Sequence, residues 1–241
     1  MNYLTKIPMR NYGQVATLTE NLITKSLQSD YASDPNNTPP ITIKTPYNYA
    51  SVSAIGIAID GVVIYPPANN TVHPAQAQAE ITNTGIHIGK GMGLHYHADG
   101  HSATSNNMNL YNSNDYIGRR HPPLIGFGLD GIALYGKYDV SYSSMHGYTT
   151  SLDQYGGHTH ADGKYGYHYH AHTVHSSDLS GMGMVLKSGT VPDANETLAT
   201  YDLHILMKGA WAGKINTIPF FWDGLEPSYT LGKNNSIFAG F

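Results

Sequence analysis

An internal repeat is the feature of this sequence that most constrains its fold. Residues 55–65 read IGIAIDGVVIY and residues 125–135 read IGFGLDGIALY, a shift of 70 (125 − 55). Residues 93–98 read GLHYHA and residues 166–171 read GYHYHA, a shift of 73 (166 − 93). Because self-similarity of this kind marks repeated supersecondary units, the sequence predicts two copies of one unit. Each copy has two apolar runs joined by Asp-Gly, followed by a ribbon that carries histidines.

Local patterns indicate that these units are β structure. The dipeptides Asp60-Gly61 and Asp130-Gly131 each lie between apolar runs, which is a strong signal for a β-hairpin. Beyond residue 50 the apolar runs are short and are separated by Gly, Asn and Pro, a pattern typical of all-β chains. We therefore expect a mainly β fold, an antiparallel sandwich or barrel-like domain with an internal pseudo-duplication.

The first 50 residues differ from the rest of the chain. Residues 34–40 read DPNNTPP, which ends any helix. The stretch 15–28 before it has apolar residues at helical spacing, namely Val15, Leu18, Leu22, Ile23 and Leu27. We expect an N-terminal arm over 1–50 with this one helix and a Pro/Asn linker. The core is then expected over 51–185, with half-repeats at about 51–101 and 121–175, and closing strands of the same domain over 186–241, one of them where apolar residues alternate in 201–207.

The charge balance excludes several classes of function. Only 12% of the residues are charged, and the 14 histidines outnumber the 13 lysines and arginines. So few fixed cations argue against a protein that binds nucleic acid or an anionic membrane. The chain has no run of the roughly 20 apolar residues needed to cross a bilayer, and its first residues lack the apolar stretch of a signal peptide. We expect neither nucleic-acid binding nor membrane insertion.

Three segments together resemble the YHYH domain family. They are residues 124–136 (LIGFGLDGIALYG), 152–160 (LDQYGGHTH) and 167–171 (YHYHA), and the match extends over about 51–175. The resemblance places the family's signature histidine pair at His168 and His170 and its Gly-His-x-His at His158 and His160. Tyr155 stands where members often have Cys, and Leu94 replaces the leading Tyr of the ribbon in the first half. Members occur in secreted bacterial proteins and in phages, which implies an extracellular or virion setting rather than a cytoplasmic one.

The histidines of the ribbons predict metal binding. Residues i and i+2 of a strand point to the same face about 6.5 Å apart, so both imidazoles of a His-x-His pair can reach one metal ion. The sequence has three such pairs, and His87 falls on His160 at the shift of 73. The predicted metal ligands are His158, His160, His168, His170, His87, His95 and His97.

Convergence of these pairs depends on the loops between them. A two-residue turn at Asp162-Gly163 would direct the His168/His170 pair to the face opposite to the one that carries the His158/His160 pair. An odd-residue loop or a bulge reverses this, and Gly163 and Gly166 permit either. The same offset recurs in the first half. We therefore predict a bulged or longer loop in both halves, with the histidines of each half facing one another.

The absence of Cys and the presence of only four Glu restrict the chemistry of such a site. Imidazole ligands, with an aspartate such as Asp99, Asp153 or Asp162, suit Cu(II), Zn(II) or Ni(II), and copper or zinc is the expected cofactor. Met182 and Met184 could add soft ligands for Cu(I). The isolated histidines His121, His146 and His175 are assigned to packing.

Three functions remain open at this point. The first is a His-rich metal-binding β module with a structural or binding role in a virion or surface assembly, attached by self-association through residues 1–50. The second is a Cu- or Zn-dependent metalloenzyme, an oxidoreductase or hydrolase with an open coordination position, in which His172 or Asp153 serves as acid or base. The third is a metal-free structural particle protein whose histidines only pack.

Overall fold

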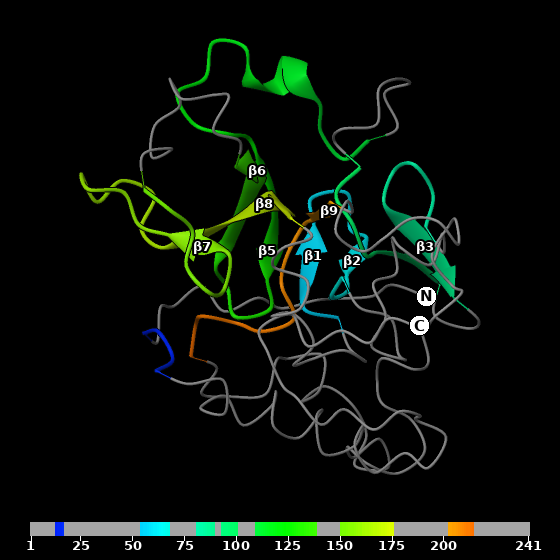
Figure 1. Cartoon of the computed structure of the whole chain (residues 1–241), viewed down its shortest axis with the longest axis horizontal. Helices are drawn as coiled ribbons and strands as arrows, with labels where there is room; N and C mark the ends of the chain where they lie inside the picture. The colour runs from blue at the N-terminus through cyan, green and yellow to red at the C-terminus, as the bar shows by residue number, and fades with distance from the viewer. Residues whose placement is uncertain are drawn as a thin grey trace.

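The described part of the computed structural model is one open, mixed β-sheet (Figure 1). The structure describes residues 13–16, 54–67, 81–89, 93–100, 109–138, 150–175 and 202–214. The elements are β1 (Gly56–Ala58), β2 (Val63–Ile64), β3 (Ile86–Gly89), β4 (Gly93–Tyr96), the 3₁₀ helix η1 (Ser113–Tyr116), β5 (Leu124–Gly128), β6 (Ala133–Tyr138), β7 (Gly157–His158), β8 (His168–Val174) and β9 (Leu203–Ile205). The expected mainly β fold is confirmed, and these residues include no α-helix.

The strand order explains why the sheet is neither a sandwich nor a barrel. The order is β3-β4-β2-β1-β5-β6-β8-β7, with β9 added beside β8. The β2–β4 and β6–β8 pairs are parallel, whereas the other pairs are antiparallel. Each unit therefore extends the sheet outward from the central β1–β5 pair. The expectation of an antiparallel sandwich or barrel was wrong in this respect, because the two units join edge to edge instead of face to face.

The central pair is symmetric about Ile57 and Phe127. These two residues are Cα partners across β1 and β5, and they are also 70 positions apart, so each matches the other in the repeat. The hydrogen bonds on either side of this pair are related by the same shift of 70. They run from Ile59 N–H to Ile125 O and from Leu129 N–H to Ile55 O, both at 3.0 Å.

The two predicted hairpins are present at the two Asp-Gly turns. Gly61 and Gly131 have φ of +85° and +84°, the left-handed conformation that closes a three-residue hairpin loop. The carboxylates of Asp60 and Asp130 accept the backbone N–H two residues on, at 2.9 and 3.2 Å. The hairpin prediction is therefore confirmed in both halves.

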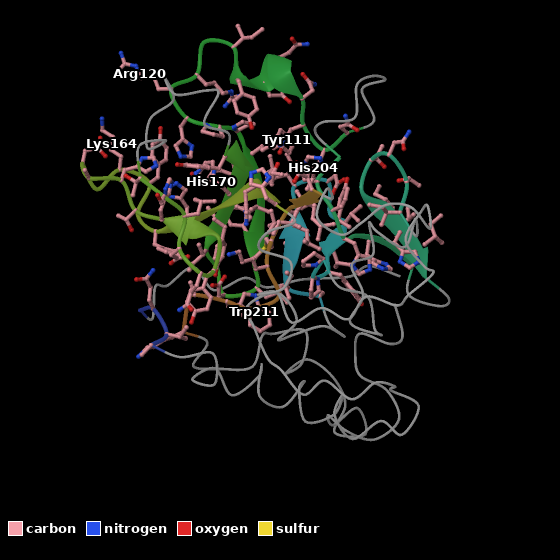
Figure 2. All side chains as sticks on the ribbon, viewed as in Figure 1. Tyr111, Arg120, Lys164, His170, His204 and Trp211 are labelled. Carbon is pink, nitrogen blue, oxygen red and sulfur yellow. The ribbon has the colours of Figure 1, made fainter. Side chains whose placement is uncertain are left out.

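The segment 202–214, which lies toward the C-terminal end of the sequence, packs against the sheet. Trp211 is buried, and its indole N–H donates to the carbonyl of Ile55 at 2.7 Å (Figure 2). Leu203 and Ile205 form β9 against β8, as the alternating pattern predicts. Apart from Trp211, the largest fully buried apolar side chains are Ile55, Ile64, Ile125, Leu134, Leu203, Ile205 and Leu206.

A buried polar network fixes this segment to the second hairpin. The hydroxyl of Tyr169 donates to Asp130 at 2.6 Å and accepts the N–H of Ala212 at 2.7 Å. Gly213 N–H donates to the same carboxylate at 2.9 Å. Burial raises the pKa of Asp130 to about 6, although these hydrogen bonds act in the opposite direction.

The start of the predicted N-terminal helix is extended. Gln14 forms a β-bridge with Gly213, and Val15 N–H donates to Ala212 O at 2.8 Å. These contacts with a distant segment hold residues 14 and 15 out of a helix. The rest of the predicted helix, the linker at 34–40, the strand over 181–186 and the last closing strands lie outside the described residues. Within the described ranges, no helix has the length and apolar character to cross a membrane.

Candidate metal centres

Two groups of histidines lie at opposite ends of the sheet. The three-histidine cluster consists of His87, His95 and His97 on and after β3 and β4. The five-histidine cluster consists of His121, His158, His160, His168 and His170. Strands β3 and β7, which begin the two ribbons, occupy the two ends of the strand order, as Figure 1 shows.

The distances within each cluster are those of possible metal sites. In the three-histidine cluster, one ring nitrogen of each residue lies within 4.8 Å of the others, and the same holds for four members of the larger cluster, His121, His160, His168 and His170. The fifth member, His158, has its Nε2 at 3.3 Å from Nε2 of His160. The structure thus brings all seven predicted ligands into one cluster or the other.

The registers of the ribbons produce this convergence. His87 lies directly opposite His95, and His158 lies directly opposite His168. An odd number of residues separates the partners in both ribbons, 88–94 and 159–167. The predicted longer loops, with the histidines of each half facing one another, are therefore confirmed. In the second loop Gly163 and Gly166 have positive φ, as their proposed role requires.

The register also corrects one match made from the sequence. The structural counterpart of His87 is His158, not His160. Gly85 and Gly156, each two residues before its histidine, have φ of +83° and +82°. The carbonyl of Gly85 accepts the backbone N–H of His97, and that of Gly156 accepts the backbone N–H of His170, both at 3.0 Å. The second ribbon is two residues longer between the paired histidines (168 − 158 against 95 − 87). Because a constant sequence shift ignores this difference in loop length, it matched His87 to the wrong histidine.

Backbone carbonyls fix the tautomer of the ligands in the three-histidine cluster. Nδ1 of His97 lies 2.6 Å from the carbonyl of Pro66, and Nδ1 of His95 lies 3.1 Å from that of Gly93. Because a carbonyl can only accept, both imidazoles carry their proton on Nδ1 and a lone pair on Nε2. Nδ1 of His87 is buried and has no hydrogen-bond partner among the described residues.

The larger cluster has the same arrangement. Four of its imidazoles place Nδ1 against a backbone carbonyl: His121 on Pro122 at 3.0 Å, His158 on Thr150 at 2.7 Å, His168 on Gly166 at 2.9 Å and His170 on Gly136 at 2.8 Å. Histidines that bind a metal almost always donate their other ring N–H in this way. The clusters therefore have the hydrogen-bonded surroundings of metal ligands as well as the distances.

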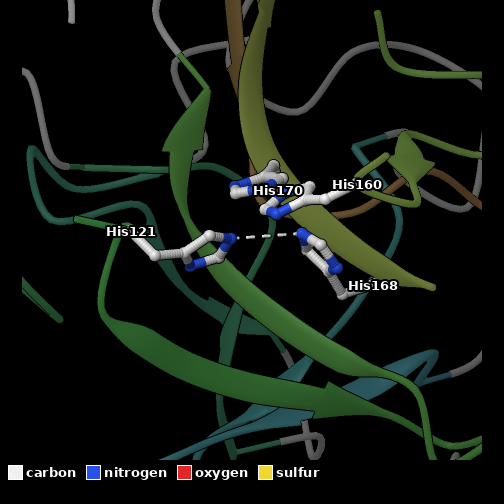
Figure 3. Close-up of side chains that lie close together, drawn as sticks. All are labelled: His121, His160, His168 and His170. Atoms are coloured by element: carbon white, nitrogen blue, oxygen red, sulfur yellow. Dashed lines mark hydrogen bonds between the residues drawn. The ribbon is translucent and has the colours of Figure 1, made fainter. Parts of the chain in front are cut away.

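The Nε2 atoms approach one another closely. The Nε2–Nε2 distance is 3.2 Å between His95 and His97 and 3.2 Å between His121 and His168. Figure 3 shows the second contact, with His160 and His170 turned toward it. With both protons on Nδ1, each contact joins two lone pairs and is repulsive unless a cation lies between them. Two nitrogens bound to one tetrahedral Zn²⁺ at 2.0–2.1 Å are roughly 3.3 Å apart, which matches the observed spacing.

A proton is an unfavourable cation for these positions. Burial, together with the neighbouring imidazoles, lowers the pKa of both His97 and His168 to about 3. Burial also holds the pKa of His170 well below its ordinary value. At neutral pH these three imidazoles are therefore neutral, which is the form that binds a metal.

Tyrosines surround both clusters. The ring of Tyr65 lies 4.5 Å from that of His95, and the ring of Tyr135 lies 5.1 Å from that of His168. Only the larger cluster has a further ring stacked on it in the described structure, because Tyr165 lies 4.2 Å from His121 at an interplanar angle of 23°. Tyr165 is also the one non-glycine residue of the described chain with positive φ, at +68°.

The expected carboxylate ligands serve other purposes. The carboxylate of Asp99 accepts the hydroxyl of Tyr111, and Asp153 closes its own turn by accepting backbone N–H groups. Asp162 pairs with Lys164 at 3.6 Å. None of these belongs to a ligand group of the described residues, which contains imidazoles only. His172, the expected acid or base, is buried with Nδ1 against the carbonyl of His170.

His121 was missed by the sequence analysis, which assigned it to packing. It belongs to no His-x-His pair and precedes β5, 47 residues from its contact His168. Only its proximity to a repeated apolar run could have indicated it. His175 forms an exposed ion pair with Asp202, whereas His146, Met182 and Met184 lie outside the described residues.

Comparisons add no relative to this description: no family model, curated protein or solved structure matches the chain. The fold and the clusters define a mainly β protein with buried groups of histidines that could hold metal ions.

Proposed function

We propose that this protein is a metal-binding β module that holds one transition-metal ion, copper or zinc, at each histidine cluster. The observation that carries the proposal is the pair of contacts in which Nε2 lone pairs face each other at 3.2 Å, His95 with His97 and His121 with His168, while the Nδ1 atom of each ring lies against a backbone carbonyl. A divalent ion converts this repulsion into coordination. We also propose membership of the YHYH domain family, which the residues at 158–170 support.

The ligand type supports copper or zinc. Imidazole nitrogens are good ligands for both ions, whereas Mg²⁺ and Ca²⁺ prefer oxygen. The chain has no Cys, so thiolate coordination makes no contribution. Among divalent first-row ions at nitrogen sites, Cu²⁺ binds most tightly, and metal availability then determines which ion is bound.

The position of the larger cluster supports a structural role for its ion. His121 lies before β5, His160 lies in the loop after β7, and His168 lies on β8. An ion held by all three would cross-link the segment before β5 to the β7–β8 ribbon, which begins more than 30 residues further along the chain. Because the unfolded chain has no such site, the free energy of metal binding would contribute to folding.

Metal analysis of untagged protein tests the proposal. We expect two ions per chain in the wild type and one in each of two variants, His95→Ala/His97→Ala and His121→Ala/His168→Ala/His170→Ala. His175→Ala is the matched control, since His175 is exposed and pairs only with Asp202 in the described structure. Circular dichroism establishes that each variant is folded. Wild-type protein that binds neither Cu²⁺ nor Zn²⁺ in stoichiometric amount would contradict the proposal.

A further inference from the structure

The two clusters share one three-imidazole arrangement. In each unit the histidine that starts the ribbon faces the two histidines that end it. The ring-centroid distances are 5.0, 5.5 and 4.9 Å for the pairs His87–His95, His87–His97 and His95–His97, and 4.9, 5.0 and 4.9 Å for His158–His168, His158–His170 and His168–His170. The second unit therefore contains the complete arrangement of the first and adds residues to it.

The additions in the second unit are two imidazoles and a covering ring, from His121, His160 and Tyr165. The matching sequence positions in the first unit are Ser51, Gly89 and Met92, by the shift of 70, by the distance from the first histidine of the ribbon, and by the shift of 73. Of these, only Met92 carries an atom that commonly binds metals. A thioether prefers Cu(I) over Cu(II) or Zn(II), so it is a poor replacement for an imidazole at a divalent ion.

The larger cluster is also more completely buried than the three-histidine cluster. His121, His160, His168 and His170 are all buried, whereas His87 on the end strand β3 is only half-buried. Tyr165 covers the imidazole of His121 in the second unit. Among the described residues, the larger cluster therefore has both more ligands and less exposure than the smaller one.

We propose, on the basis of the proposed metal binding, that the ion at the three-histidine cluster takes a monodentate ligand from solution. Zinc sites with four protein ligands are closed and structural, whereas sites with three keep a position for water or substrate. The ion at the five-histidine cluster has its positions filled by imidazoles and takes no external ligand. The two sites thus divide a ligand-binding role from a structural role.

The charge of the site defines the chemical class of this ligand. Neither group of possible metal ligands contains a carboxylate, so a divalent ion bound by neutral imidazoles keeps its full charge of +2. A small anion that donates through nitrogen or oxygen is favoured over a neutral donor, because it compensates that charge. Azide represents this class and has a charge-transfer band when it binds Cu²⁺.

Azide titration of the Cu²⁺-loaded full chain tests the inference. We expect wild type and His121→Ala/His168→Ala/His170→Ala, which lacks the larger site, to develop the azide–copper band with the same midpoint. His95→Ala/His97→Ala should retain one Cu²⁺ and lose the band. The single variant His87→Ala, at a half-buried position, should also lose at least half of the band if the double variant does not fold. Met92→Ala is the control for the thioether and should titrate as wild type does.

The outcomes separate this inference from the proposed function. Two bound Cu²⁺ without any azide band, or a band that survives in His95→Ala/His97→Ala, would overturn the open site and leave metal binding intact. A band that appears only after Met92→Ala would show that the thioether fills the position, which also overturns the inference. Absence of bound Cu²⁺ in the wild type would instead refute the metal-binding proposal itself.

Discussion

Nε2 of His121 and Nε2 of His168 lie 3.2 Å apart, although each ring has its Nδ1 against a backbone carbonyl. The contact connects the segment before β5 to the first residue of β8. Without a cation the contact opposes folding, whereas the proposed metal ion would join the two segments. The stability of the sheet would then depend on metal content.

Removal of metal should lower the thermal stability of the protein. A ligand present at 100 times its Kd stabilises the native state by about 2.7 kcal/mol per site, and a chain of this size loses about 2–4 °C of Tm per kcal/mol. We expect dialysis against EDTA to lower Tm by several degrees. Added Cu²⁺ or Zn²⁺ should restore Tm, and Mg²⁺ should not. Equal Tm values for the EDTA-treated and reloaded protein would contradict this prediction.

Tyr165 should control the rate at which the larger cluster releases metal. Its ring stacks on His121, and its φ of +68° is strained for a residue with a Cβ. Tyr165→Gly relieves that strain and removes the covering ring. We expect the metal-free variant to unfold within about 1 kcal/mol of wild type, while a chelator removes metal from this site faster. Tyr165→Phe keeps the ring and should release metal at the wild-type rate.

Tyr169 and Tyr96 are a matched pair for testing the buried network. Both donate a hydroxyl to the aspartate of their own hairpin, Asp130 at 2.6 Å and Asp60 at 2.7 Å. Tyr169 also accepts the N–H of Ala212, and its aspartate is buried, whereas Asp60 is exposed. Tyr169→Phe should therefore cost about 2–3 kcal/mol because it leaves buried polar groups unsatisfied, and Tyr96→Phe about 1 kcal/mol or less.

Urea unfolding of both variants measures this difference. Equal losses would show that the buried carboxylate and Ala212 find other partners in Tyr169→Phe. A larger loss in Tyr96→Phe would contradict the assignment of the network to the second hairpin.

Asp130 should make the stability fall as pH rises from about 4 to about 6. Burial raises its pKa from the ordinary 3.8 to about 6 in the folded chain. In this window the folded state holds a proton that the unfolded state has lost, so a rise in pH favours unfolding. At about 1.4 kcal/mol per pH unit the contribution is about 3 kcal/mol at most. Above pH 6 it is constant.

Asp130→Asn isolates this contribution. The difference in free energy of unfolding between wild type and variant should decrease from pH 4 to pH 6, measured in EDTA so that metal does not compete with protons. The buried histidines titrate in both proteins and therefore cancel in the difference. A difference that stays flat across this pH range would contradict the raised pKa of Asp130.

Much of the fold was predictable because its signals are local. The Asp-Gly hairpins, the β class and the facing ribbon histidines follow from turn chemistry and strand parity over a few residues. The open sheet was not predictable, because the joining of β1 to β5 depends on contacts between positions 70 apart, such as Ile57 and Phe127. Likewise Val15 begins a run of apolar residues at helical spacing, yet its hydrogen bond to Ala212 holds it in an extended conformation.

The candidate site shows the same division. The three His-x-His pairs follow from strand periodicity, which is visible in the sequence. His121 joins the cluster only because β5, β6 and β8 lie in that order in the sheet. An aspartate was expected among the ligands, but the clusters contain imidazoles only. The reason is again structural, because Asp153 accepts a hydrogen bond in the turn that positions His158.

The symmetric pairing about Ile57 and Phe127 joins two similar units as an interface joins two identical subunits. In a homodimer, every substitution would appear in both subunits, and the two sites would change together. Here both units belong to one chain, so the second can carry His121 where the first carries Ser51. The shared sheet is kept while each end of it is free to evolve its own coordination chemistry.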